Sequence, residues 1–241
     1  AAYDDEAALL ELAHRSAVLT YEFENVAEET LKKAAAYATL PQGVNLLHIT
    51  GQRLREKNFL RDVQVPVTEF ASVVDAASLQ TAITKVGYPA LLKTVSGGYD
   101  GHGQLDINNS ADLITAKKLY DQAPCILEAR QNFQAEASIM VTRDLHQKTY
   151  TFPLVTNQHK NHILHTTIAA NQFPETLRQK AKSYAEKIAE KLDLYGVLGI
   201  EFFVINDHEL IVNELAPRPH NSGHYTIEAC NISQFEAHIR S

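Results

Sequence analysis

The sequence contains no tryptophan, one methionine and only two cysteines among its 241 residues. Cys125 and Cys230 form no Cys-x-x-Cys pair, so the sequence indicates neither a disulfide framework nor a cysteine-bound metal site. This cysteine content fits a reducing compartment, and we therefore expect a cytoplasmic protein.

Long apolar runs are also missing. The longest apolar stretch, Gly196 to Ile205, is interrupted by Glu201, and the acidic segment Tyr3-Asp4-Asp5-Glu6 does not resemble a signal peptide. The formal net charge is −7, and no cluster of basic residues is interleaved with aromatic residues. We therefore expect no membrane and no nucleic acid among the partners.

What the chain does contain is 45% hydrophobic residues, enough to bury a substantial core in one or two domains. Thr50 is expected to cap a helix that carries Arg53. The helix that begins at Pro174 carries an apolar face that we expect in the core. The pattern predicts an α+β fold with helices near 5–15, 75–86, 110–120 and 174–192, and strands near 18–21, around Lys93, and near 125–129, 135–142, 148–156 and 163–169.

A short polar turn at residues 206–208 separates two apolar runs and predicts a β-hairpin. If the loop has two residues, 206 pairs with 209 and, counting back, Glu201 faces Glu214. Like charges directly opposite each other destabilise a sheet. The pair therefore indicates a divalent cation, because Mg²⁺ commonly takes one or two carboxylates plus substrate phosphates. The alternative, a glutamate solvated at a sheet edge, stays open.

Four of the ten glycines fall between Gly97 and Gln104. Glycine lets the backbone approach a ligand closely, and successive N–H groups can turn toward phosphate oxygens. The segment lacks the Gly-Lys-Ser/Thr of a P-loop and the helix of a dinucleotide fingerprint. Lys93 precedes it on an expected strand, where its charge could reach the same phosphates. A mobile hairpin is the alternative for the glycine-rich segment by itself.

Together these residues resemble the ATP-grasp superfamily and, within it, the N5-carboxyaminoimidazole ribonucleotide synthetases, bicarbonate-using ligases of purine biosynthesis. The resemblance runs nearly end to end, and its most specific segment is the Glu214-to-His224 string Glu-Leu-Ala-Pro-Arg-Pro-His-Asn-Ser-Gly-His. The other matching segments are residues 21–26, 53–57, Lys93, 98–104, 125–128, 136–138, His159, Asn213 and 233–238.

The resemblance implies a site for ATP and Mg²⁺. Glu201 and Glu214 look like the Mg²⁺ ligands, in agreement with the hairpin argument, and Glu136 is implied to bind the ribose. The residues implied to hold ATP are Arg53, Lys93, Gly98, Tyr99, Asp100, Gly101, His102, Gly103, Gln104, Glu128, Ala129, Arg130, Gln131, Glu136, His159, Asn213 and Glu214.

The implied reaction is ATP-dependent carboxylation of aminoimidazole ribonucleotide by bicarbonate through carboxyphosphate, with release of ADP and phosphate. Arg218, His220 and Asn221 look like the groups that bind bicarbonate or carboxyphosphate. His220 could orient bicarbonate or move a proton, and the sequence leaves both roles open. Tyr99 and Asp100 would face the aminoimidazole nucleotide. The resemblance also implies a homodimer.

Three positions depart from the usual family pattern. His102 stands where Lys or Arg is common, Ala137 stands where a larger aliphatic residue is usual, and Arg130-Gln131 replaces a more apolar hinge. These differences bear on ATP affinity rather than on the reaction class.

Family members open with a Rossmann-like domain and close with a small β-rich domain. By the resemblance, this chain begins inside the first and stops before the second, so we expect a fragment that binds ATP but has an incomplete substrate site. Residues 1–48 would form the end of the Rossmann-like domain, and residues 49–241 the ATP-grasp domain. Within the latter we expect a lid near 75–131 and a larger subdomain at 132–241.

Two rival functions stay open. Another ATP-grasp ligase, such as the formate-dependent glycinamide ribonucleotide transformylase or a biotin carboxylase, would share the ATP and metal residues but not the whole 213–224 string. A non-catalytic nucleotide-binding or dimerisation module is the rival from a different class. Such a module has no need of Lys93, Glu201, Glu214 and Arg218 together.

Overall fold

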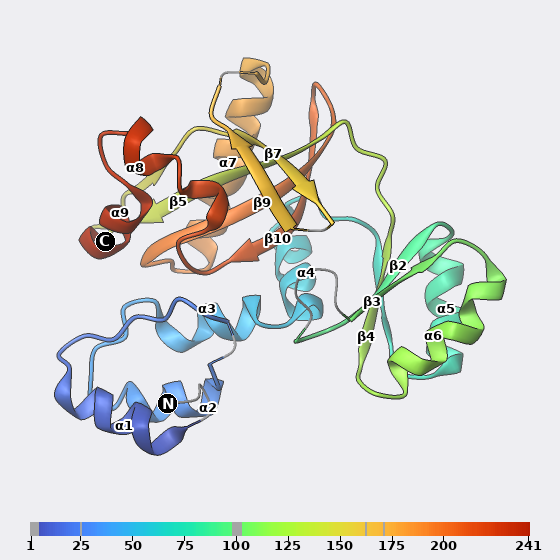
Figure 1. The fold of residues 1–241 in the computed structure, drawn as a ribbon, viewed down its shortest axis with the longest axis horizontal. Helices are drawn as coiled ribbons and strands as arrows, with labels where there is room; N and C mark the ends of the chain where they lie inside the picture. Colours follow the sequence, from blue (N-terminus) through green and yellow to red (C-terminus); the bar gives the residue numbers. More distant parts are fainter. Residues whose placement is uncertain (1–4, 25, 98–102, 162, 171) are drawn as a thin grey trace.

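The computed structural model describes residues 5–24, 26–97, 103–161, 163–170 and 172–241. Within them the chain forms a helical N-terminal lobe, a four-stranded antiparallel sheet and a six-stranded antiparallel sheet (Figure 1). Helix α4 (Arg53–Asp62) lies between the lobe and the two sheets. This is the α+β fold that the sequence predicts.

The N-terminal lobe packs its helices around small apolar clusters that include Leu19, Tyr21 and Leu31. The first helix begins at the predicted cap, where the Asp5 carboxylate accepts the Ala8 N–H. The strand expected near 18–21 is wrong, because the segment pairs only through one parallel bridge between Val18 and Thr39. The helices of the lobe are α1 (Glu6–Arg15), α2 (Glu28–Ala34) and α3 (Gly43–Thr50).

The predicted cap of α4 is also wrong. Thr50 ends α3, and its hydroxyl donates to the Leu46 carbonyl. Helix α4 instead follows Gln52, whose side chain makes no cap bond. The Arg53 N–H donates to the Val95 carbonyl at 2.8 Å, so a strand end of the small sheet satisfies the start of the helix.

In the small sheet the strands lie in the order β1-β4-β2-β3. Leu92 and Leu127 face the apolar cluster under α5 and α6, so Lys93 and Glu128 point to the opposite face. The short strand β1 was not expected, and its pairing with β4 defines it. The elements of this unit are β1 (Phe70–Val73), α5 (Ala76–Val86), β2 (Ala90–Thr94), β3 (Gln104–Ile107), η1 (Ser110–Asp112), α6 (Leu113–Tyr120) and β4 (Cys125–Ala129).

The large sheet runs in the order β10-β9-β5-β7-β8, and β6 pairs with β5. The single strand expected near 148–156 is split into β6 and β7 around Pro153, which has no N–H for a ladder bond. The strands are β5 (Ala135–Arg143), β6 (Thr149–Thr151), β7 (Val155–Lys160), β8 (Ile163–Ile168), β9 (Gly196–Asn206) and β10 (Glu209–Ala216).

Helix α7 (Glu175–Lys191) covers one face of the large sheet. Its predicted apolar stripe is confirmed, with Leu177, Ala181, Ala185 and Ile188 fully buried. The short elements η2 (Asn221–Gly223), α8 (Thr226–Ala229) and α9 (Gln234–Arg240) follow β10. None of the helices in the described ranges has both the length and the apolar character needed to cross a bilayer.

A hydrogen-bond network ties the N-terminal lobe to the far end of the chain. The Gln42 amide donates to the carbonyls of Tyr21 and Pro217, while its oxygen accepts the Thr20 hydroxyl. His238 on α9 accepts the Val197 N–H at Nδ1, so its Nε2 carries the proton and donates to Thr20. The lobe and the loop after β10 therefore hold one another in place.

Gly196→Ala should destabilise the protein more than Gly43→Ala. Both glycines have positive φ, but a Cβ on Gly196 would lie 2.8 Å from His238 Nδ1, whereas a Cβ on Gly43 would meet nothing within 4 Å. We expect Gly43→Ala to cost about 1 kcal/mol and Gly196→Ala at least about 2 kcal/mol more. Urea unfolding followed by circular dichroism measures both, and equal losses would contradict the role of the His238 contact.

Candidate functional site

The β9–β10 hairpin brings two carboxylates to opposite positions. Glu201 pairs with Glu214, as the sequence predicts. The register between them is not simple, because Leu210 faces Val204 rather than residue 205. A shift beside Leu210 is compensated by a second one at Asn213, which restores the predicted pair. A bulge re-aims the side chains next to it, so Asn213 and Glu214 both reach this site.

Glu201 lies where a charge is unfavourable. Burial, followed by the charge of Glu214, raises the pKa of Glu201 to about 8. The side chain of Asn213 partly offsets this with a hydrogen bond. The carboxylate pair thus carries a repulsion that a bound cation would replace with attraction.

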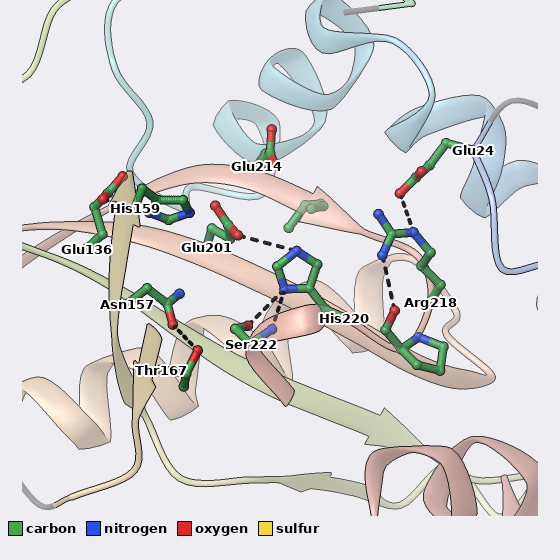
Figure 2. Close-up of polar contacts among 12 residues, drawn as sticks. Glu24, Glu136, Asn157, His159, Thr167, Glu201, Glu214, Arg218, His220 and Ser222 are labelled. Atoms are coloured by element: carbon green, nitrogen blue, oxygen red, sulfur yellow. Dashed lines mark hydrogen bonds and ion pairs between the residues drawn. The ribbon is translucent and has the colours of Figure 1, made fainter. Parts of the chain in front are cut away.

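His220 reaches the same carboxylate from the loop after β10. Its Nε2 lies 3.4 Å from Glu201 Oε1, and its Nδ1 lies 2.8 Å from the Ser222 hydroxyl (Figure 2). Because Nδ1 also accepts the Ser222 N–H, the proton of the neutral ring sits on Nε2. Burial, and then the charge of Arg218, lowers the pKa of His220 to about 4. Because the ring is neutral, its 3.4 Å approach to Glu201 is not an ion pair.

Arg218 is tied to the N-terminal lobe. Its Nε donates to Glu24 Oε1 at 2.9 Å, and its Nη1 donates to the Pro219 carbonyl at 3.1 Å (Figure 2). Glu24 lies in the 21–26 segment of the family resemblance, which implies no role for it. The sequence signal that could have pointed to Glu24 is an acidic residue in a turn, because the implied bicarbonate-binding loop carries the cation Arg218. Asn221 begins the η2 turn and is exposed.

On the small sheet, Lys93 donates to Glu128 Oε2 at 2.8 Å, and both side chains are almost inaccessible to solvent. Burial alone would raise the pKa of Glu128, but the charges of Lys57, Lys93 and Arg53 hold it at about 2. The other oxygen, Oε1, is buried and has no partner among the described residues. That oxygen can accept a hydrogen bond from a ligand.

Arg53 connects the two sheets. Its backbone N–H binds the Val95 carbonyl beyond β2, and its Nη1 lies 3.5 Å from Glu214 Oε2 on β10. The first residue of α4 therefore places a cation between the strand that carries Lys93 and the strand that carries Glu214.

A further pair lies on the large sheet. His159 Nδ1 is 2.8 Å from Glu136 Oε2, and this hydrogen bond is the main reason why the pKa of His159 is raised. Figure 2 shows both side chains beside Glu201 and Glu214. The Glu136–His159 pair thus extends the polar surface along the sheet.

The segment after β4 connects the two sheets. Ala129 accepts the Thr68 hydroxyl and the Gln131 amide, and Arg130 pairs with Asp106 on β3. The Arg130 N–H also binds the Pro89 carbonyl. These contacts tie the segment to the small sheet and to the residues next to its strands.

The predicted glycine loop is described only in part. Gly103 has φ +73°, and its carbonyl accepts the Thr94 N–H. Gln104 begins β3 opposite Lys93. The predictions for Gly98, Tyr99, Asp100, Gly101 and His102 fall outside the described residues.

The donor set fits Mg²⁺ only with help from a ligand. The described part of the chain holds no group of three or more histidine, cysteine, aspartate or glutamate side chains arranged to bind a metal. Two facing carboxylates are nevertheless the usual protein share of a Mg²⁺ site whose other ligands are phosphate oxygens and water. Such a site forms together with a nucleotide, and Glu201 and Glu214 have this arrangement.

The facing carboxylates, the Lys93–Glu128 pair and the two antiparallel sheets are the arrangement of the ATP-grasp fold. A model of the ATP-grasp domain matches residues 58–235. The chain belongs to the ATP-grasp family.

Among relatives of this chain is the N5-carboxyaminoimidazole ribonucleotide synthase of Bacillus subtilis, 42% identical over 99% of this chain and 63% of that protein. The Staphylococcus aureus synthetase complexed with ADP superposes with a TM-score of 0.94 at 42% identity, covering 99% of this chain and 64% of that one. The Aspergillus clavatus synthase in complex with ADP and 5-aminoimidazole ribonucleotide superposes with a TM-score of 0.92 at 28% identity. This match covers 100% of this chain and 63% of that one. The chain spans 63% of the length of the Bacillus relative.

Glu128→Gln should reduce the loss of unfolding free energy as the pH falls. The folded pKa of about 2 lies below the ordinary value, so ionised Glu128 stabilises the folded state fully above about pH 4.3. This stabilisation is lost as the pH falls toward 2. The difference in unfolding free energy between the native protein and the variant should therefore shrink between about pH 5 and pH 2, as measured by urea unfolding. A constant difference would show that Glu128 is not held ionised.

Proposed function

We propose that this chain is the ATP-binding and bicarbonate-activating part of an N5-carboxyaminoimidazole ribonucleotide synthase. The observation that carries the proposal is that Glu214, Arg218 and His220, from the string most specific to that family, meet Glu201 of β9. The relatives supply the substrate class, since one was solved with ADP and the aminoimidazole nucleotide.

The nucleotide would lie between the two sheets. Lys93 and Arg53 supply positive charge from the small sheet and from α4, and the free Glu128 oxygen would accept a donor on the base. Glu136, His159 and the predicted hinge at Ala129, Arg130 and Gln131 would bind the ribose and adenine side. Mg²⁺ on Glu201 and Glu214 would bridge and neutralise the phosphates.

Bicarbonate would bind at the loop after β10. Arg218 offers a planar cation suited to a carboxylate-like anion, and Glu24 fixes its orientation. His220 and Asn221 lie next to it and would complete the anion site. Alignment and charge neutralisation are the main demands of phosphoryl transfer, and these residues supply both.

We also propose the division into residues 1–48, a lid near 75–131 and a larger subdomain at 132–241. The four-stranded sheet that would form the lid also includes β1, which precedes residue 75. We propose a homodimer from the family resemblance and a cytoplasmic location from the cysteine content.

Phosphate release from ATP tests the function, measured with this chain and with a version extended by the two flanking domains that the family resemblance implies. We expect release only from the extended version, where it should require Mg²⁺, bicarbonate and aminoimidazole ribonucleotide together. Glu214→Gln should lower it at least about 100-fold, because it removes a metal ligand, whereas Glu209→Gln at the exposed turn should leave it unchanged.

The other outcomes separate the rival functions. Release that is indifferent to bicarbonate and to the aminoimidazole nucleotide would indicate another ATP-grasp ligase. ATP binding without release by either protein would indicate a non-catalytic module. Full activity of Glu214→Gln would remove the metal assignment.

Arg218→Ala should separate bicarbonate use from nucleotide binding. We expect the KM for bicarbonate to rise about tenfold or more, because the anion loses its bidentate donor, while the Kd for ADP changes less than about twofold. Steady-state kinetics and calorimetry measure the two constants. An equal loss in both would place Arg218 in the nucleotide site.

A further inference from the structure

Helix α4 presents two adjacent charged residues that the proposed chemistry does not use. Lys57 is 2% exposed and Glu56 is 3% exposed. Lysine and glutamate are almost never buried to this extent unless they are paired. Their partners therefore indicate what the two side chains do.

Lys57 binds backbone rather than a carboxylate. Its ammonium donates to the carbonyls of Val212 and Asn213. Within the described residues it forms no ion pair. The two carbonyls belong to the bulge of β10, between Val212 and Glu214, where the pairing with β9 is interrupted. A bulge leaves the extra residue unpaired, and a buried carbonyl without a partner is costly.

Glu56 and the segment before β1 complete the contact with this side of β10. Glu56 Oε2 accepts the Leu215 N–H at 3.0 Å, and the Pro66 carbonyl accepts the Val212 N–H at 2.9 Å. Along residues 212–215, therefore, two side chains of α4 and one carbonyl bind backbone groups that a neighbouring strand would otherwise pair. The Glu56–Lys57 clamp, as we call these two side chains, fixes the bulge from the side away from β9.

The position of Lys57 also bears on charge. It is the first of the groups that favour ionised Glu128, and it acts in the same way on Glu56. The ammonium thus acts on acidic side chains of two elements, β4 and α4, while its hydrogen bonds go to backbone carbonyls. It can offset their repulsion while its hydrogen bonds stay on the strand.

We propose that Lys57 is a positioning residue for the metal: its hydrogen bonds to Val212 and Asn213 hold the bulge that aims Glu214 across the hairpin at Glu201. The inference rests on the proposed metal site. Lys57 would act on the Mg²⁺ ligand Glu214, whereas Lys93 would act on the nucleotide.

The test is the Mg²⁺ dependence of ADP binding, measured by calorimetry with Mg²⁺ and with EDTA. In the native protein Mg²⁺ should tighten ADP binding. Lys57→Met should reduce that tightening about tenfold, the loss typical when a partner that orients a metal ligand is removed, and should leave the Kd in EDTA within about threefold. Lys57→Arg, which keeps donors for both carbonyls, should retain most of the tightening.

Lys182→Met on the exposed side of α7 is the matched control and should change neither constant. If Lys57→Met does not unfold cooperatively, Lys57→Gln replaces it, since the amide keeps one donor to the carbonyls. Its tightening should fall at least about threefold.

Each result decides between the two proposals. An unchanged Mg²⁺ effect in the folded Lys57 variants, or an equal loss with and without Mg²⁺, would overturn the positioning role alone. A native protein whose ADP binding ignores Mg²⁺ would overturn the metal site and, with it, the role of Lys57.

Discussion

The repulsion between Glu201 and Glu214 is the constraint on which the rest of the site depends. A sheet ordinarily avoids like charges at opposite positions. In the β9–β10 hairpin one register shift follows Glu209, and a second one after Val212 brings Glu214 back opposite Glu201. Burial makes the repulsion stronger, as the raised pKa of Glu201 shows. Arg53 on α4 places a positive charge beside Glu214, and the Mg²⁺ proposed for this site would add a second one. The hairpin is therefore stable in this form only because other parts of the fold supply compensation.

Part of the site is built by residues outside the segment that matches the ATP-grasp domain. The ATP-grasp match begins at residue 58, whereas Glu24, Arg53 and Lys57 precede it and still reach the site. Arg218 is oriented by Glu24, and the carbonyl of Pro217 is held by Gln42. The loop after β10 is thus held jointly by the N-terminal lobe and by β10. If this loop binds bicarbonate as proposed, a change in the lobe would alter bicarbonate binding through the loop.

The sequence predicted the elements whose signals are local and missed those set by tertiary contacts. The apolar stripe of α7 could be identified because a helical period is written in nearby residues. The Glu201–Glu214 pair was found although the assumed register was wrong between them, since two opposite shifts cancel. Neither bulge has a sequence signature of its own, and the buried partners of Lys57 lie 155 and 156 positions away in the chain. A single sequence contains no signal for such long-range pairs.

The geometry also narrows the role of His220, which the sequence left open. Both donors of Ser222 occupy Nδ1, and the Nε2 proton faces Glu201, so neither nitrogen has a free lone pair for a substrate proton. Proton transfer by this ring would first require the loss of one of these bonds. Orientation requires no such step, because an N–H fixed by Ser222 can hold a carboxylate or an anion in one place. The η2 turn therefore favours an orienting role for His220 over proton transfer.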